Sequence, residues 1–264
     1  MRLPFIGTRR SFATVFAVVL LGASAHAAEL GVMTSGAFTA ALLELKPVYE
    51  GKSGNKLTIL TTTMGTGTAS IPNRLERGEA ADVVIVDDTS LEDLIARGLV
   101  VAGTRVPLAR SLMGMAVRAG APKPDISSVE AFRNALLQAK SIAYSASVSG
   151  RYLSTEVFPR LEIAEQLAGK ARRIEGERVG AVVARGEAEI GFQQVSELLP
   201  VPGIDYVGPL PPGIQKATIF SAGIPKGSMN RDAAAELIRF LGSADSSQVI
   251  TRTGIEAVVT NAVK

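Results

Sequence analysis

The sequence contains no cysteine and no tryptophan, and its single histidine, His26, lies close to the amino terminus. A chain without cysteine forms no disulfides and offers no thiolate to a metal or a substrate. Without histidine in the rest of the chain, serine–histidine and cysteine–histidine catalysis are excluded, and so is a histidine-based metal site. We therefore expect no metal and no other cofactor, and a hydrolase that uses one of the serines is disfavoured.

The sequence also lacks an apolar run long enough to cross a membrane near its start. Residues 12–21 are apolar, but a bilayer requires about 20 residues. Basic residues precede this run and Ala25-His26-Ala27 follows it, which is typical of a cleaved signal peptide. We expect residues 1–27 to be a signal peptide and the mature protein to be periplasmic. The segment Thr8-Arg9-Arg10-Ser11-Phe12 also resembles a twin-arginine signal, although paired arginines occur in ordinary signals too.

The predicted mature chain has no net charge. The 28 Lys and Arg residues exceed the 25 Asp and Glu residues by three, and the three extra charges are Arg2, Arg9 and Arg10. A neutral chain with four tyrosines and no tryptophan gives no support for nucleic-acid binding. The remaining chain of roughly 237 residues suffices for two modest lobes or one large domain, and we expect a monomer.

Two short segments resemble one another: RLERGEAADVVIV at residues 74–86 and VVARGEAEIGFQQ at residues 182–194. In each, a helical run ends at Arg-Gly, where glycine suits the left-handed position after a helix. An apolar strand follows. Many α/β turns use this chemistry by chance; the alternative is two similar lobes that each deliver a strand to a common cleft.

Strand-like runs alternate with helical patterns, which indicates an α/β fold with two lobes and largely parallel sheets. Pro47 is expected to bend the helix that follows Gly36. In SSVEAFRNALLQAK, Ser127 and Glu130 form a predicted capping box. The predicted strands are residues 30–33, 57–62, 83–86, 141–144 and 190–193, and two short strands near residues 106–117 and 217–224 are expected to join the lobes.

Small hydroxyl and amide residues follow the ends of five predicted strands. Each such loop fits a helix cap or a turn by itself, but ligands in α/β sheets bind beyond the carboxyl ends of strands. Together the loops predict a ligand-binding cleft. They contain Thr34, Ser35 and Gly36; Met64, Gly65 and Thr66; Asp87 and Asp88; Ser145, Ser147, Ser149 and Gly150; and Gln193 and Gln194.

The serine loop belongs to the stretch SASVSGRYLSTEVF, in which Arg151 and Tyr152 open a predicted helix. The start of a helix presents free backbone N–H groups and a positive dipole end, which favour an anion. The planar guanidinium of Arg151 matches a carboxylate with two parallel hydrogen bonds. Arg110, near the first crossing between the lobes, is a second candidate. Both arginines are also compatible with solvated surface positions.

With these features the chain resembles the molybdate-binding-protein-like periplasmic solute-binding proteins. The resemblance covers essentially all of the mature chain, and its most specific segments are ELGVMTSGAFTAALLELKPVYEGKSG, IPNRLERGEAADVVIV and GEAEIGFQQVSELLPVPGIDYVGPLP. It implies two α/β lobes that are joined by a two-strand hinge and close on an oxyanion. Lobe one would comprise residues 28–110 and 219–264, and lobe two residues 111–218.

By resemblance, Ser35 is the serine whose hydroxyl and neighbouring amides hold the oxyanion. Two positions depart from the family's pattern. A second serine is replaced around Met64-Gly65-Thr66, and the place where molybdate binders commonly carry a tyrosine is Gln193 or Gln194. Because Arg151 also stands at the mouth of the cleft, we favour a small organic polycarboxylate over molybdate. The leading hypothesis is an exported binder of this anion, with a membrane ABC permease as its partner.

An enzyme on the same scaffold is the alternative hypothesis. The wider resemblance includes an aconitate-isomerase-like branch, whose reaction moves a proton across an allylic system without a metal. Such a reaction requires acid–base groups. Tyr152 and Arg151 are the first candidates, and Tyr144, Asp87 and Asp88 are others. The sequence leaves binder and isomerase open, because both need the same anion cradle.

Overall fold

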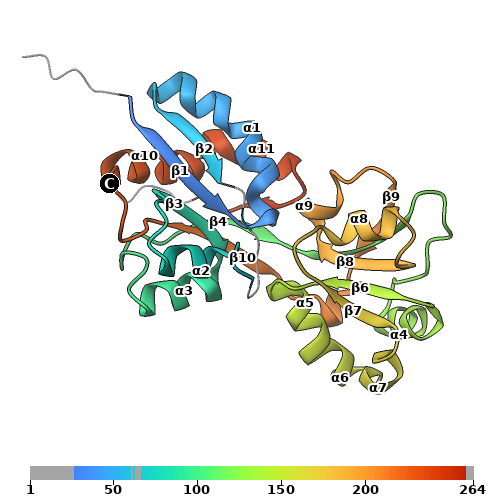
Figure 1. Ribbon diagram of the computed structural model, residues 1–264. Helices are drawn as coiled ribbons and strands as arrows, with labels where there is room; N and C mark the ends of the chain where they lie inside the picture. Colours follow the sequence, from blue (N-terminus) through green and yellow to red (C-terminus); the bar gives the residue numbers. More distant parts are fainter. Residues whose placement is uncertain (1–26, 61, 63–66, 260–264) are drawn as a thin grey trace, which may run out of the picture.

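The computed structural model describes residues 27–60, 62 and 67–259. In this part the chain forms two α/β lobes, each built around one sheet (Figure 1). The signal-peptide prediction for residues 1–26 lies outside the described residues, and so do Met64, Gly65 and Thr66. None of the helices in the described ranges has the length and apolar character that crossing a membrane requires.

The first lobe contains a six-stranded sheet in the order β11-β4-β10-β3-β1-β2. β1 pairs in parallel with β2 and β3, whereas β10 runs antiparallel to β3 and β4. The strands are β1 (Glu29–Thr34), β2 (Lys56–Leu60), β3 (Val83–Asp87), β4 (Val106–Ser111), β10 (Thr218–Gly223) and β11 (Glu256–Ala257). One face is covered by α1 (Gly36–Ser53), α10 (Arg231–Leu241) and α11 (Ala244–Arg252), and the other by α2 (Ile71–Glu76) and α3 (Asp88–Ala96).

The apolar run of β3 shows why this sheet is buried on both faces. Val83 and Ile85 belong to the core packed under α1 and α10, whereas Val84 and Val86 belong to the core under α2 and α3. All four side chains are fully buried. Because successive side chains of a strand point to opposite faces, a continuous apolar run is what a central strand between two helical layers requires.

The second lobe contains a five-stranded sheet in the order β7-β6-β8-β5-β9. β6 pairs in parallel with β7 and β8, and β5 runs antiparallel to β8 and β9. The strands are β5 (Met113–Arg118), β6 (Ile142–Ser145), β7 (Ala171–Ile174), β8 (Ile190–Gln194) and β9 (Ile204–Pro209). The helices are α4 (Val129–Gln138), α5 (Val148–Tyr152), a π-helical turn (Leu153–Val157), α6 (Phe158–Arg160), α7 (Ala164–Leu167), α8 (Val179–Ala184), α9 (Val195–Leu198) and a 3-10 turn (Pro212–Ile214).

The repeated segments have the same geometry in both lobes. Gly78 follows α2 with a φ of 74°, and Gly186 follows α8 with a φ of 76°. These values lie in the left-handed region that glycine tolerates. In each lobe the next strand, β3 or β8, is the central one that runs to the boundary between the lobes. The interpretation of the repeat as two similar α/β units is therefore confirmed.

Several sequence-based expectations need correction. Both sheets are mixed rather than largely parallel, because the strands that connect the lobes run against their neighbours. Helix α4 begins at Val129 and its cap is Ser128, not Ser127: the Ser128 hydroxyl accepts a hydrogen bond from the Ala131 N–H at 3.0 Å. Helix α1 continues through Pro47 to Ser53, and the bend at Pro47 stays a prediction.

The chain crosses between the lobes in two adjacent segments. β4 leads into β5 through Leu112, and the chain returns from β9 into β10. The side chain of Gln215 ties the segments together, because its amide donates to the Met113 carbonyl at 2.8 Å and accepts from the Met113 N–H at 3.2 Å. The predicted connecting strands coincide with β4–β5 and β10.

Candidate functional site

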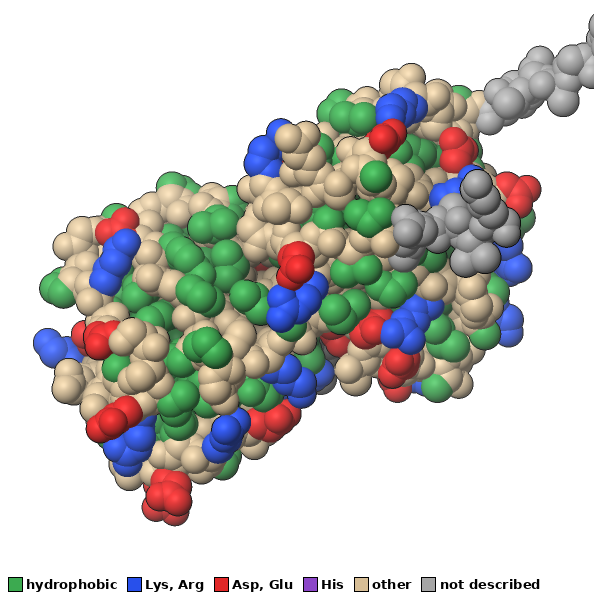
Figure 2. Space-filling view, turned by 180° about the vertical axis from the view of Figure 1, so that it is seen from behind, with side chains coloured by type: hydrophobic (Ala, Val, Ile, Leu, Met, Phe, Trp, Pro, Cys, Tyr) green, Lys and Arg blue, Asp and Glu red, His purple; other side chains and the backbone are tan. Residues whose placement is uncertain are grey.

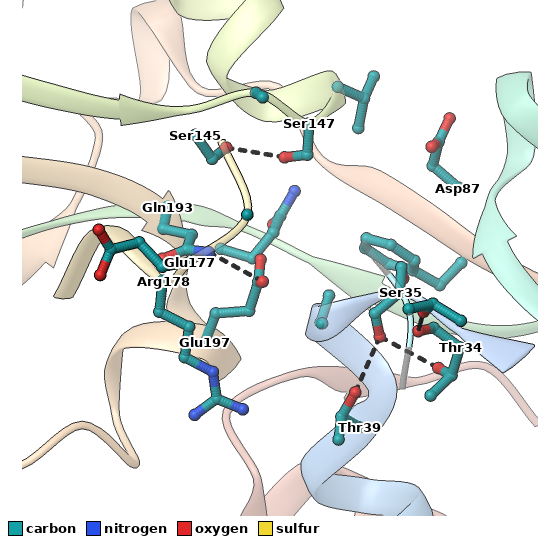
Figure 3. Close-up of a pocket in the computed structure, with 18 of the residues that line it drawn as sticks. Thr34, Ser35, Thr39, Asp87, Ser145, Ser147, Glu177, Arg178, Gln193 and Glu197 are labelled. Carbon is teal, nitrogen blue, oxygen red and sulfur yellow. Dashed lines mark hydrogen bonds between the residues drawn. The ribbon is translucent and has the colours of Figure 1, made fainter. Parts of the chain in front are cut away.

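A cleft of about 340 Å³ lies between the two lobes (Figure 3). The β1–α1 turn and the end of β3 form its first-lobe wall, and the ends of β6 and β8 form its second-lobe wall. We call it the interlobe cleft. Its position beyond the carboxyl ends of parallel strands is the usual place for a ligand in α/β folds.

The structure brings most of the predicted loops to this cleft, although their binding role stays a prediction. The predicted residues that line it are Thr34, Ser35, Gly36, Ser145, Ser147, Gln193 and Gln194. A neighbouring cavity of about 370 Å³ is lined by Asp88, Ser149, Arg151 and Tyr152, and it shares Asp87 and Val148 with the interlobe cleft. Neither cavity is lined by Gly150 or Arg110.

The first-lobe wall is built around Ser35, the residue that precedes α1. Its backbone carbonyl accepts hydrogen bonds from the hydroxyls of Thr34 and Thr39, both at 3.1 Å (Figure 3). Its own hydroxyl is buried and has no hydrogen-bond partner among the described residues. A buried polar group without a partner costs about 1–3 kcal/mol. The first turn of α1 contains no acidic residue, so this wall offers an unused hydroxyl beside the positive end of a long helix.

Three serines form the opposite wall. The Ser145 hydroxyl lies 2.7 Å from that of Ser147 and 3.2 Å from that of Ser149, and the last two are 3.1 Å apart. Each hydroxyl can donate as well as accept. Ser145 and Ser147 line the interlobe cleft and Ser149 lines the neighbouring cavity, so the cluster connects the two spaces.

The amides at the end of β8 have different surroundings. Gln193 accepts from the Val179 N–H at 2.9 Å and donates to Oε1 of Glu197 at 2.9 Å. Gln194 donates to the Thr218 hydroxyl at 3.1 Å, while its Oε1 is buried and meets no donor from residues 27–60, 62 or 67–259. Gln193 is thus held in place by the protein, whereas Gln194 keeps an unused acceptor in the cleft.

Sequence reasoning missed three charged residues of the cleft, Glu177, Arg178 and Glu197. Glu197 is only 9% exposed. Burial raises the pKa of its carboxyl to about 7, although nearby Arg178 and the hydrogen bond from Gln193 act in the opposite direction. The signal in the sequence was a single acidic residue in the apolar segment VSELL, directly after the two glutamines.

The sequence profile of the bacterial extracellular solute-binding proteins matches residues 30–256. The chain belongs to this family.

Two curated relatives and one solved structure define its place in the family. The chain is 44% identical to an aconitate isomerase from Pseudomonas sp. over 256 residues, which cover 97% of this chain and 98% of that protein. It is 27% identical to the molybdate-binding protein ModA of Azotobacter vinelandii, with 89% and 92% covered. The periplasmic molybdate-binding protein structure from the same organism superposes with a TM-score of 0.67 at 17% identity, covering 88% of this chain and all of that one. At this identity the structure shows a shared fold alone.

Other predicted site residues of this family member have partners elsewhere in the protein. Asp88 accepts from the Ser221 hydroxyl at 2.6 Å and from Nε of Arg105 at 2.8 Å. Arg110 pairs with Glu256 at 2.8 Å in the first lobe, so the predicted second arginine of the cleft is placed away from it.

The two tyrosines proposed as acid–base groups also have structural roles. Tyr152 donates its hydroxyl to the Ile214 carbonyl at 3.1 Å, and Nζ of Lys216 lies 5.0 Å from its ring centre. Tyr144 packs edge-on against Phe158 with ring centres 6.0 Å apart. Neither tyrosine lines the interlobe cleft.

Arg151 lies in the neighbouring cavity and is exposed. Among the described residues its guanidinium has no hydrogen bond or ion pair, and Lys216 of the same cavity pairs with Glu156 at 3.5 Å. Its predicted role as a ligand contact stays a prediction, and its place is beside the interlobe cleft rather than within it.

In the described part of the chain, no group of three or more Asp, Glu, His or Cys side chains lies close enough together to hold a metal ion. On the outer face seen in Figure 2, acidic and basic side chains are intermingled rather than gathered by sign. The cleft offers hydroxyls, amides, one helix start and the buried carboxyls of Asp87 and Glu197, a set suited to binding a small oxygen-rich anion and moving a proton on it.

Replacing Ser35 with alanine is expected to weaken binding of a carboxylate ligand about 10- to 100-fold, because a hydrogen bond to a charged group contributes about 1.5–3 kcal/mol. The fold should lose little, since no residue in the described part of the chain bonds to this hydroxyl. Isothermal titration with propane-1,2,3-tricarboxylate measures the effect. Ser247→Ala is the control that should bind normally, because Ser247 is half-buried on α11, its hydroxyl donates to the Ala244 carbonyl, and it lines neither cavity. Equal affinities of the two variants for the ligand would show that Ser35 does not contribute to binding.

Proposed function

We propose that this family member is an exported isomerase that interconverts the cis and trans forms of a small unsaturated tricarboxylate, with aconitate as the substrate. The relationship to an aconitate isomerase extends over nearly the whole length of both chains. The observation that carries the proposal is the buried carboxyl of Glu197 in a cleft that is otherwise suited to an anion.

A protein that only binds a polycarboxylate gains nothing from such a group. A like charge beside the ligand weakens binding, and burial of the carboxylate is itself unfavourable. An enzyme that moves protons needs a group that is partly protonated and partly ionised near neutral pH. The pKa of Glu197, raised by burial to about 7, meets this requirement. The carboxyl therefore favours the isomerase over the simple binder.

The neutral donors of the cleft suit the charge that this reaction develops. Removing a proton from the methylene group of aconitate spreads negative charge over the carbon chain and its carboxylates. Ser35 and the start of α1 on one side, with Ser145 and Ser147 on the other, can donate hydrogen bonds to those oxygens. Donors that are already in position stabilise such charge without reorganisation.

The proposal includes export to the periplasm. Its support is the signal-like segment of residues 1–27, with the paired arginines Arg9 and Arg10, and membership of an extracellular protein family. The enzyme would then encounter its tricarboxylate substrate outside the cytoplasm. Fractionating cells that express the full chain tests this part of the proposal.

The protein is expected to convert trans-aconitate to the cis isomer and to incorporate deuterium from heavy water during turnover or exchange. Proton NMR of trans-aconitate incubated with the mature chain follows both signals in one experiment. Ser35→Ala, which removes a donor from the cleft, should turn over more slowly, and Ser247→Ala should match the unaltered chain. Tight binding of aconitate with neither isomerisation nor exchange would contradict the isomerase.

The second candidate is a transport binder of a small anion, which would deliver its ligand to an ABC permease. The hydroxyl and amide donors of the cleft favour it, because Arg151, the predicted partner of a carboxylate, lies in the neighbouring cavity. A ligand that binds only the folded protein raises its stability by about 2.7 kcal/mol at 100 times the dissociation constant. A thermal-shift panel of molybdate, tungstate, sulfate, citrate and both aconitates therefore separates an inorganic oxyanion from an organic one.

A further inference from the structure

Glu197 presents one carboxylate oxygen that is held and one that is free. Oε1 accepts from Nε2 of Gln193 at 2.9 Å, and Gln193 is fixed in turn by the backbone N–H of Val179 at 2.9 Å. No described residue donates a hydrogen bond to Oε2. The carboxyl is thus oriented through its neighbour while one oxygen stays available to a molecule in the cleft.

The same carboxyl lies where the two lobes meet. A methyl group on Gly36, at the start of α1, would come within 2.0 Å of Oε1, so the glycine allows this close approach. The adjacent Ser196 donates its hydroxyl to the Ala37 carbonyl at 2.8 Å. Helix α9 therefore carries Glu197 across to the wall that holds Ser35, and a ligand between the walls would touch both residues.

The other charged groups that line the interlobe cleft are already engaged or cannot accept a proton. Asp87 caps α3, accepting from the N–H of Ser90 at 3.0 Å and from its hydroxyl at 2.7 Å. Glu177 pairs with Arg185 at 2.9 Å. The guanidinium of Arg178 offers hydrogen-bond donors and no acceptor. Of the carboxyl groups that line this cleft in the described residues, Glu197 is the one that neither forms an ion pair nor caps a helix.

We propose that Glu197 is the catalytic acid–base residue of the interlobe cleft, an inference that rests on the proposed function. Its free oxygen takes the proton from the methylene carbon of the substrate and returns a proton at the far carbon of the double bond. The C–H bond that breaks supplies the electron pair of the new double bond, and the former double-bond pair forms the new C–H bond. No proton is gained or lost overall, and no oxidant or reductant is required.

The electrostatic environment supports this role. Burial raises the pKa of Glu197, and Arg178 is the charged group that opposes this effect. From the elements packed around α9, Asp87 and Glu177 are the other charged groups that line the cleft, and each is bound to a donor of its own. The first turn of α1 adds no acidic residue. The result is a base that regains its proton readily, as a reversible proton transfer requires.

The test compares the full mature chain with Glu197→Gln, which keeps the size of the side chain but cannot carry the proton. We expect the turnover number with trans-aconitate, and the rate of deuterium exchange, to fall about 10²- to 10⁴-fold. Affinity for the saturated analogue propane-1,2,3-tricarboxylate should change less than tenfold. The rate of the unaltered protein should rise as the pH passes through 7, whereas any residual rate of the variant should not depend on pH in that range.

Glu165→Gln is the matched control, because Glu165 is an exposed carboxylate of the same lobe, on α7. It should retain full activity, and Glu197→Asp should retain a reduced, pH-dependent rate. Activity of Glu197→Gln equal to that of the control would overturn the assignment while the isomerase stands. A parallel loss of analogue binding and turnover would instead make Glu197 a binding residue and would also overturn it. Absence of turnover in the unaltered protein would overturn the proposed function itself.

Discussion

Gly150→Ala is expected to lower the free energy of unfolding by about 3 kcal/mol, at the upper end of the usual cost of inserting a methyl group into a packed site. The new methyl carbon would lie 1.6 Å from the carbonyl oxygen of Ser145 and 2.7 Å from its carbonyl carbon. Both atoms belong to the backbone, so no flexible side chain can move aside. The β6–α5 turn must shift, which displaces the Ser145 and Ser147 hydroxyls of the cleft.

Urea denaturation followed by far-ultraviolet circular dichroism measures this effect in a chain that lacks tryptophan. Gly51→Ala is the matched control, because Gly51 lies inside α1 and an added methyl group there meets no atom within 4 Å. Alanine at that position should stabilise the protein by about 0.5–1 kcal/mol through its better helix propensity. Equal midpoints for Gly150→Ala and the unaltered protein would show that the turn is more adaptable than the close contact implies.

Glu197→Gln is expected to become progressively more stable than the unaltered protein as the pH rises from 4 to 8. The pKa of Glu197 is about 7 in the folded chain, compared with the ordinary value of 4.5. Between these values the folded state binds more protons than the unfolded state, so stability falls as the pH rises. The loss begins near pH 4.5 and is complete above pH 7, and the neutral glutamine avoids it. Two and a half pKa units correspond to about 3 kcal/mol.

The quantity to measure is the difference in unfolding free energy between the variant and the unaltered protein at each pH. Other carboxyl groups titrate equally in both proteins and cancel in this difference. The same difference for Glu165→Gln should stay flat, since Glu165 is exposed. A flat profile for Glu197→Gln as well would mean that Arg178 compensates the buried charge and that the carboxylate form is stable in the cleft.

Local patterns were sufficient to predict much of this fold. The fully apolar run of β3 and the two Arg-Gly helix ends have the same physical consequence in any sequence, and both were interpreted correctly. The mixed character of the sheets was not predictable from these patterns. It depends on β10, which returns from the second lobe and inserts between β3 and β4, and such a long-range pairing leaves no local periodicity.

The same distinction applies to the candidate site. Ser35, Ser145 and Gln193 were predicted to share a cleft because loops at strand ends converge in α/β folds, and the structure places them there. Glu197 was missed because one of the two contacts around its carboxyl is distant in sequence: besides the amide of Gln193, four residues away, it lies against Gly36 in the other lobe. Arg151 was assigned to the wrong one of two adjacent cavities, because the sequence fixes the turn but not the direction in which its side chain points.

The insertion of β10 between β3 and β4 also governs the order in which the two sheets can be completed. Every strand of the second sheet lies between Met113 and Pro209, so a chain growing from its amino terminus holds all of that sheet once residue 209 has been made. The first sheet still lacks its two last strands at that stage, and β3 and β4 have no common neighbour until Phe220 is available to pair with both. Closing this long loop carries an entropic cost, and that step can follow only after every strand of the second sheet has been made. The later part of the chain thus completes the lobe that the earliest part began.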